Sequence, residues 1–202
     1  MVDETYVFDP MSHEGHVSNK IVFALERLSH VFRIHWWEEH KNFQLSPLQM
    51  QLLVTLQFQP TLDSVSAMAS YLKLSNATVS DAVRVLIGKA YVQKQSSPED
   101  GRRHHLRLTE TGQQTALELS KFANQIRDFV QTVPNQEQFL DSLLHLMHQL
   151  QRTGFIPLQQ MCPTCYHFRQ TDGDSPYYCQ LLQQPLLIED LRIHCQEHEL
   201  VA

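Results

Sequence analysis

Residues 74–112 read LSNATVSDAVRVLIGKAYVQKQSSPEDGRRHHLRLTETG, and this stretch decides the fold. Ser75 caps a predicted helix with one apolar and one polar face. Residues 91–95 and 105–109 then alternate between apolar and polar side chains, which predicts the two strands of a hairpin. The loop between them holds an Asp-Gly turn signal and two adjacent arginines. The segment therefore predicts a helix, a hairpin with a basic tip and the start of another helix.

Helical spacing of apolar residues extends this prediction along the chain. Ser46-Pro47 begins a helix, because serine is a good N-cap and proline is tolerated at the first helical position. Pro134 is expected to break the helix that follows the hairpin. The expected helices are 16–43, 46–59, 64–74, 75–89, 109–132 and 136–152. Three regions follow: an irregular segment 1–15, a helical domain with a hairpin over 16–152, and a separate tail over 153–202.

The charge of the chain is unevenly distributed. The formal net charge of the 202 residues is -6. From Lys73 to Arg107 there are seven basic and three acidic residues, a net +4, so the remainder carries -10. This local excess is what contact with nucleic-acid phosphates requires, although an ordinary solvated face is an equally good interpretation of charge alone.

Several classes of protein are disfavoured. No run of about 18 apolar residues predicts a membrane span. The acidic start MVDETYVFDP lacks the apolar core of a signal peptide, so we expect a cytoplasmic protein. No Gly-rich phosphate loop and no convincing catalytic constellation stands out, so we do not expect an enzyme.

Three stretches resemble the MarR family of bacterial transcription regulators: SPLQMQLLVTL, SVSAMASYLKLSNATVSDAVRVLIGKAYVQKQ and SPEDGRRHHLRLTETG. The resemblance covers roughly residues 16–152, and its most specific part is the pattern D-x-R-R-x-x-x-L-x-L-T-x-x-G. Gly101 departs from this family, in which many members carry a larger residue there, and His104-His105 follow the arginines. The resemblance implies a mainly α fold with a small β-hairpin wing, a winged helix-turn-helix that binds double-stranded DNA.

The helix capped by Ser75 is then the expected reading helix in a major groove. Arginine pairs with guanine and asparagine with adenine, so Arg84 and Asn76 are the expected base readers. Residues at the helix start are expected to contact phosphate, helped by free backbone N–H groups. An ion pair between Arg84 and Asp81, three residues apart, is the alternative role of that arginine. The residues assigned to DNA here are Ser75, Asn76, Thr78, Ser80 and Arg84.

The wing supplies the remaining predicted DNA contacts. Arg102 and Arg103 at its tip are expected to enter a minor groove or to grip the backbone. In the MarR family the wing aspartate commonly holds a wing arginine, and Asp100 matches that position.

The resemblance also implies a homodimer, most often a repressor, with a small aromatic effector bound beside the dimerisation helices. Helix 16–43 agrees independently, because it has more apolar surface than one domain of this size needs. The alternative is that Trp36 and Trp37 cap the core of a monomer. Both tryptophans and Tyr71 are also candidates to line an effector pocket, although core packing is the preferred interpretation.

All four cysteines lie in the last 41 residues, with the spacing C-x2-C-x13-C-x15-C: Cys162, Cys165, Cys179 and Cys195. Ordinary MarR proteins lack such a tail, so it is an appended cysteine-rich module. A short piece with little apolar content needs a metal or cross-links to hold a shape. In the cytoplasm this pattern favours a metal over disulfides.

The predicted cofactor is an iron–sulfur cluster, [4Fe–4S], with Zn²⁺ as the close alternative. Four thiolates suit tetrahedral zinc, but zinc ribbons usually end in a second CxxC. The segment CPTCYHF…CQLLQQPLLIEDLRIHC is similar to high-potential iron–sulfur proteins in its cysteine spacing. Nearby His167, His194 and His198 are not assigned as ligands. The predicted function is a regulator whose tail senses redox state or metal supply; a redox or electron-transfer protein is the alternative, as is a purely structural zinc site.

Overall fold

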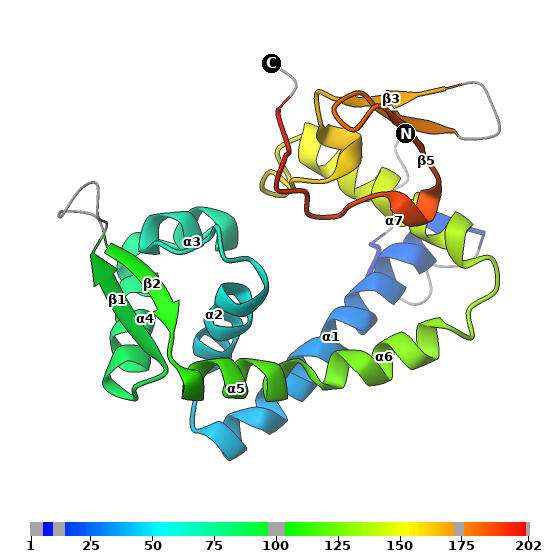
Figure 1. The fold of residues 1–202 in the computed structure, drawn as a ribbon. Helices are drawn as coiled ribbons and strands as arrows, with labels where there is room; N and C mark the ends of the chain where they lie inside the picture. Colours follow the sequence, from blue (N-terminus) through cyan, green and yellow to red (C-terminus); the bar gives the residue numbers. More distant parts are fainter. Residues whose placement is uncertain (1–5, 10–14, 97–103, 172–175, 201–202) are drawn as a thin grey trace. The chain divides into compact units, whose positions relative to one another are not determined.

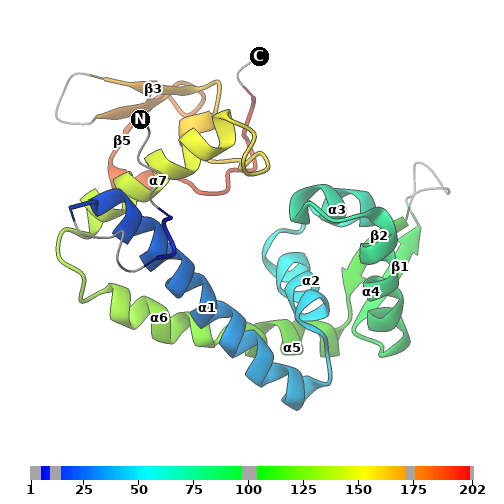
Figure 2. The ribbon, with the colours of Figure 1, turned by 180° about the vertical axis from the view of Figure 1, so that it is seen from behind.

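The computed structural model describes residues 6–9, 15–96, 104–171 and 176–200. Contacts divide the chain into two compact units, Met1–Val65 with Ser80–Phe122 and Ser66–Val79 with Ala123–Ala202. Figures 1 and 2 show the elements in order, namely α1 (Val17–Phe43), α2 (Pro47–Phe58), α3 (Val65–Leu72), α4 (Asn76–Gly88), β1 (Val92–Ser96), β2 (His104–Leu108), α5 (Glu110–Ser120), α6 (Phe122–Val130), α7 (Gln136–Arg152), η2 (Cys162–Thr164), β3 (Phe168–Gln170), β4 (Tyr177–Cys179), β5 (Gln184–Leu186) and η3 (Ile188–Asp190). The prediction of a mainly helical chain with a small hairpin is confirmed.

The N-termini of α2 and α4 form as their sequences predict. At α2, the Ser46 hydroxyl accepts a hydrogen bond from the Gln49 N–H at 3.3 Å, and the Gln49 side chain accepts one from the Ser46 N–H at 2.9 Å. This capping box satisfies two backbone donors that the helix leaves unpaired. At α4, the Ser75 hydroxyl accepts a hydrogen bond from the Thr78 N–H at 3.1 Å.

A tight turn joins α3 to α4. Lys73 has φ of 54°, and the Leu74 N–H donates to the Ala69 carbonyl at 2.9 Å. A residue in the left-handed region followed by such a back-bond ends a helix sharply. Only three residues therefore separate the end of α3 from the start of α4.

The hairpin and the start of α5 are joined through Thr109. β1 and β2 pair antiparallel, from Val92 opposite Leu108 to Ser96 opposite His104. The Thr109 hydroxyl donates to the Ala90 carbonyl at 2.6 Å and accepts from the Gly112 N–H at 3.0 Å, so it also caps α5. The threonine and the glycine of the L-T-x-x-G part of the wing pattern are therefore the two residues that join the hairpin to α5.

Gly112→Ala is expected to lower the free energy of unfolding by about 2–3 kcal/mol. A Cβ at this position would overlap the carbonyl oxygen of Tyr91, and a backbone atom cannot move aside cheaply. Urea unfolding of the purified variant measures the change. Gly88→Ala is the matched control, because a Cβ there meets nothing within 4 Å. Equal stability of both variants would contradict the close approach.

One predicted helix is two. The segment 109–132 was expected to be continuous, but α5 ends at Ser120 and α6 begins at Phe122. Lys121 keeps nearly helical angles, φ -61° and ψ -33°. Its N–H donates to the carbonyl of Glu118, three residues earlier, whereas an α-helix uses the carbonyl four residues earlier. The spacing of apolar residues does not predict a break of one residue, because the residues on both sides of it remain helical.

The second unit contains its own apolar core. Four buried side chains form it: Leu144 of α7, Met161, Leu186 and Leu191. β3, β4 and β5 make a three-stranded antiparallel sheet beside them, with Phe168 opposite Cys179. The tail thus packs more apolar surface than its sequence suggested, because α7 supplies part of the core. The predicted boundary between residues 152 and 153 stays a prediction.

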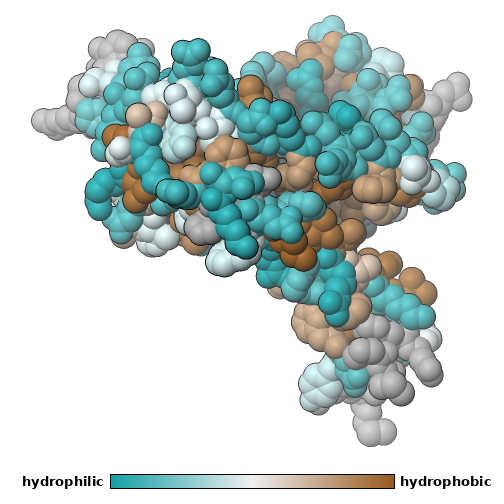
Figure 3. All heavy atoms as spheres, turned by 90° about the horizontal axis from the view of Figure 1, so that it is seen from below, coloured by the Kyte–Doolittle hydropathy of each residue, from teal (hydrophilic) through white to brown (hydrophobic). Residues whose placement is uncertain are grey.

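Helix α1 exposes many apolar side chains in the single chain. They are Val17, Ile21, Val22, Leu28, Val31, Phe32, Ile34 and Trp37, the last with 60% of its surface exposed. Apolar side chains interrupt the hydrophilic surface on the face drawn in Figure 3.

Within the part of the chain that the structure describes, no helix combines the length and apolar character needed to cross a membrane.

Candidate functional site

Helix α4, the expected reading helix, has the two faces that the sequence predicts. Along it, Val79, Val83 and Leu86 are buried. The opposite face carries the predicted DNA residues: Ser75, Asn76, Thr78 and Arg84 are exposed, and Ser80 is half-buried. Side chains on this face are therefore available to a duplex, although their contacts with bases and phosphates stay predictions.

In the structure, Arg84 forms the ion pair with Asp81 that was its alternative predicted role. Its Nη1 lies 2.8 Å from Oδ1 of Asp81, and the two side chains are 74% and 68% exposed. Exposed ion pairs contribute only about 0.2–1 kcal/mol, whereas a bidentate contact with a base is worth about 1–3 kcal/mol. The ion pair is therefore compatible with a base-reading role, because DNA contact outweighs it.

Three wing residues assigned from the sequence, Asp100, Arg102 and Arg103, lie outside the residues that the structure describes. The described base of the wing is held by Asp63, which the sequence did not single out. Its carbonyl accepts a hydrogen bond from the Leu106 N–H at 2.6 Å. Its carboxylate lies 2.9 Å from Nδ1 of His105 and 2.8 Å from Nη1 of Arg107. No local pattern predicts contacts across more than forty residues.

Asp63→Ala is expected to lower the free energy of unfolding by about 1–2 kcal/mol. The carboxylate is only 19% exposed and joins two β2 side chains, so its loss removes the carboxylate partner of both. Thermal and urea unfolding measure the effect. Glu118→Ala is the control, since it removes an exposed pair with Lys121 that is worth under about 0.5 kcal/mol. A loss from Asp63→Ala no larger than this control would refute the bracing role.

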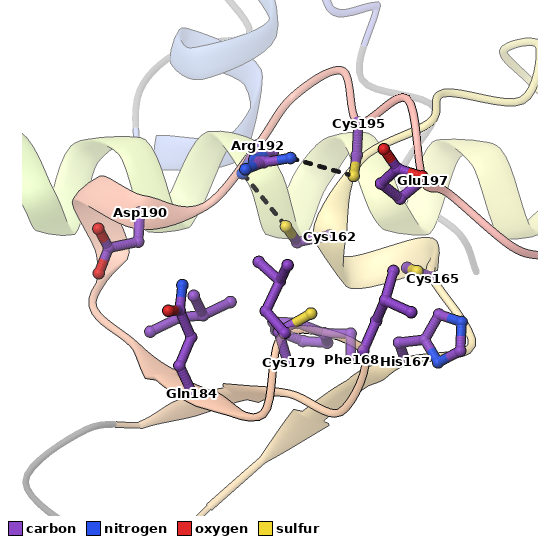
Figure 4. A pocket seen from close by; sticks show the side chains of 13 residues that line it. Cys162, Cys165, His167, Phe168, Cys179, Gln184, Asp190, Arg192, Cys195 and Glu197 are labelled. Carbon is purple, nitrogen blue, oxygen red and sulfur yellow. Dashed lines mark hydrogen bonds between the residues drawn. The ribbon is translucent and has the colours of Figure 1, made fainter.

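The four cysteines line one cavity of about 280 Å³ in the second unit. Figure 4 shows that they reach it from three segments of the chain: Cys162 and Cys165 from η2 and its end, Cys179 from the end of β4, and Cys195 from the C-terminal arm. All four are free thiols and half-buried. The sequence motif is therefore brought together in space, although 33 positions separate its first and last cysteine.

Two thiols of the cavity receive hydrogen bonds from Arg192. Its backbone N–H donates to Cys162 Sγ at 3.2 Å, and its guanidinium lies 3.8 Å from Cys195 Sγ. Burial raises the pKa of the Cys162 thiol; the Arg192 N–H opposes this shift, while the charges of Cys195, Cys179 and Cys165 add to it. The four thiols therefore lie close enough for a negative charge on one to disfavour ionisation of Cys162.

Four polar residues that line this cavity were not singled out from the sequence: Gln184, Asp190, Arg192 and Glu197. His167 lines it too. His167 was set aside as a ligand, and its Nε2 lies 3.3 Å from a carboxylate oxygen of Glu199 without the alignment of a hydrogen bond. Among the residues described, no three His, Cys, Asp or Glu side chains converge on a point where one metal ion would bind.

Residues 43–103 match the family model described as the MarR family. The fold is similar to a MarR transcriptional regulator from Methanosarcina mazei Go1, with a TM-score of 0.53, 20% identity, and coverage of 66% of this chain and 97% of that one. It is also similar to MepR, a transcription regulator of the Staphylococcus aureus multidrug efflux pump MepA, with a TM-score of 0.50, 20% identity, and coverage of 64% and 97%. No curated protein sequence matches. At this identity the structures establish the winged-helix fold, and about a third of the chain lies outside the match.

Proposed function

Because residues 43–103 match the MarR family and the fold is that of solved MarR regulators, we propose that this protein is a DNA-binding transcription regulator. The observation that carries the proposal is the outward polar face of α4, with Asn76 and Arg84 exposed beside a wing hairpin. A helix with this face fits the major groove, and the flanking hairpin is suited to the adjacent backbone. That it is not an enzyme stays a prediction.

The proposed regulator is a homodimer. Eight large apolar side chains on α1 are exposed in the single chain, and so many exposed apolar side chains on one helix support an interface with a partner. A symmetric dimer would present two reading helices to successive major grooves. We propose a repressor, and the small-molecule effector that the resemblance implies stays a prediction.

The proposed tail cofactor is a [4Fe–4S] cluster, with Zn²⁺ as the alternative. Its support is the donor set: four thiols from three segments line one cavity. In a zinc site each thiolate sulfur lies about 2.3 Å from the metal, so the four sulfur atoms lie within about 4 Å of one another. Four sulfur atoms arranged around a cavity instead suit a larger group, such as a cluster. When bound, the cluster supplies redox and oxygen sensitivity to the site.

The tail is linked to α7 through shared packing. Cys162 and Cys179 pack against the same apolar core as Leu144 of α7, and the Tyr177 hydroxyl donates to Asp141 of α7 at 2.6 Å. Burial, with the hydrogen bond to Asp141 and its charge, raises the pKa of Tyr177 to about 12, so the phenol stays protonated at neutral pH. Release of the three cysteine segments would uncover α7, and we propose that this change regulates DNA binding.

Duplex binding by anaerobically purified protein tests this function. The expected result is selection of a defined operator from genomic DNA fragments, with affinity that falls steeply as salt rises. A reversible redox couple without salt-dependent DNA affinity would instead support the electron-transfer alternative. Metal and sulfide analysis of the same sample separates an iron–sulfur cluster from zinc.

A further inference from the structure

We infer that Arg192 is a positioning residue that orients two cysteine thiolates of the tail and balances their charge. This inference rests on the proposed metal site. Arg192 contacts Cys162 through its backbone N–H and Cys195 through its guanidinium, and its carbonyl accepts from the Cys162 N–H at 2.9 Å. Figure 4 shows Arg192 beside both thiols, with its two contacts to them dashed. One residue thus fastens the C-terminal arm to the CxxC turn.

The charges around the cavity give Arg192 a second effect. Asp190 and Glu197 also line it, so four thiolates would meet two further negative groups. Arg192 carries the one permanent positive charge among the described lining residues. Hydrogen bonds to sulfur and nearby positive charge favour the more negative, reduced state of a thiolate-bound cluster, so they raise its reduction potential.

A general packing role for the Arg192 side chain is disfavoured by its exposure. The residue itself is exposed, whereas its neighbour Leu191 is buried and anchors the arm in the core. Replacing the guanidinium therefore removes charge and one sulfur contact while the backbone contacts with Cys162 remain.

The matched control is Arg169, a second exposed arginine of the tail. Its guanidinium donates to the carbonyls of Tyr166 and Phe168 at 2.6 and 2.7 Å and lies over the Tyr166 ring. It is not among the residues that line the cysteine cavity. Arg169→Gln therefore removes the same charge from the tail without touching the thiols.

The test is a potentiometric titration of the full chain, purified anaerobically, followed by visible absorbance. Arg192→Gln is expected to reduce the equilibrium constant for cluster reduction at least tenfold, a downward shift of about 59 mV for one electron. Arg192→Lys should recover most of the shift, and Arg169→Gln should show none. An unchanged potential in Arg192→Gln at equal cluster content, or an equal shift in Arg169→Gln, would overturn the inference.

Zinc in place of iron and sulfide would reject the proposed cluster but not the role of Arg192. Competition with a chromophoric chelator then decides: Arg192→Gln should bind zinc at least tenfold more weakly than Arg169→Gln. Equal zinc affinity overturns the inference, and protein that binds neither group overturns it together with the proposed site.

Discussion

Replacing Cys179 with serine is expected to prevent the purified protein from holding the proposed iron–sulfur cluster. Cys179 is the one proposed ligand that the β3–β5 sheet supplies, so without it the proposed site would lose both a thiolate and a connection between segments. Serine is nearly isosteric, but its hydroxyl is a poor ligand for iron at neutral pH. Iron and sulfide content per chain, with the visible spectrum, measures the loss.

The loss should extend to the fold of the tail. Cys179 packs beside the core of Leu144, Met161 and Leu186, and binding of the cofactor contributes directly to folding. Protease resistance of residues 153–200 should fall with the loss of iron. His194→Ala is the control, because His194 lies beside a cysteine but not along the cavity. A Cys179→Ser protein with full iron content would refute the four-cysteine site.

Arg84→Ala combined with Arg102→Ala and Arg103→Ala is expected to abolish measurable operator binding. Arg84→Ala alone should cost about 1–3 kcal/mol, roughly a tenfold to hundredfold loss of affinity, and should relax specificity at one base pair. Each wing arginine that contacts phosphate should reduce the salt slope by about 1. Fluorescence anisotropy at several salt concentrations separates the two effects.

Two substitutions act as controls for DNA binding. Arg127→Ala removes an exposed arginine of α6 that pairs with its neighbour Asp128, outside the reading helix and wing. Asp81→Ala frees Arg84 from its ion pair and should leave affinity equal or higher. If the triple variant bound the operator as well as Arg127→Ala does, the assignment of α4 and the wing to DNA would be wrong.

Local signals explain why much of the fold is predictable. Ser46 and Ser75 are N-caps in both the sequence prediction and the structure, because capping depends on a few neighbouring residues. Apolar spacing likewise identifies the buried face of α4. The two strands of the hairpin follow from the alternation of apolar and polar residues.

Contacts between distant residues explain what the sequence did not predict. Asp63 braces β2 from 42 and 44 positions away, and Arg192 reaches Cys162 from 30 positions away. Neither residue stands in a recognisable motif. Likewise, the tail owes its core to Leu144 of α7, which no pattern within residues 153–202 reveals.

We propose that the state of the cysteine site controls DNA binding by the winged helix. Operator affinity of one anaerobic preparation, measured before and after cluster removal at fixed salt, tests it most directly. We expect at least a tenfold loss of affinity on removal, reproduced by Cys179→Ser. Equal affinity of the cluster-containing and cluster-free protein would contradict the claim.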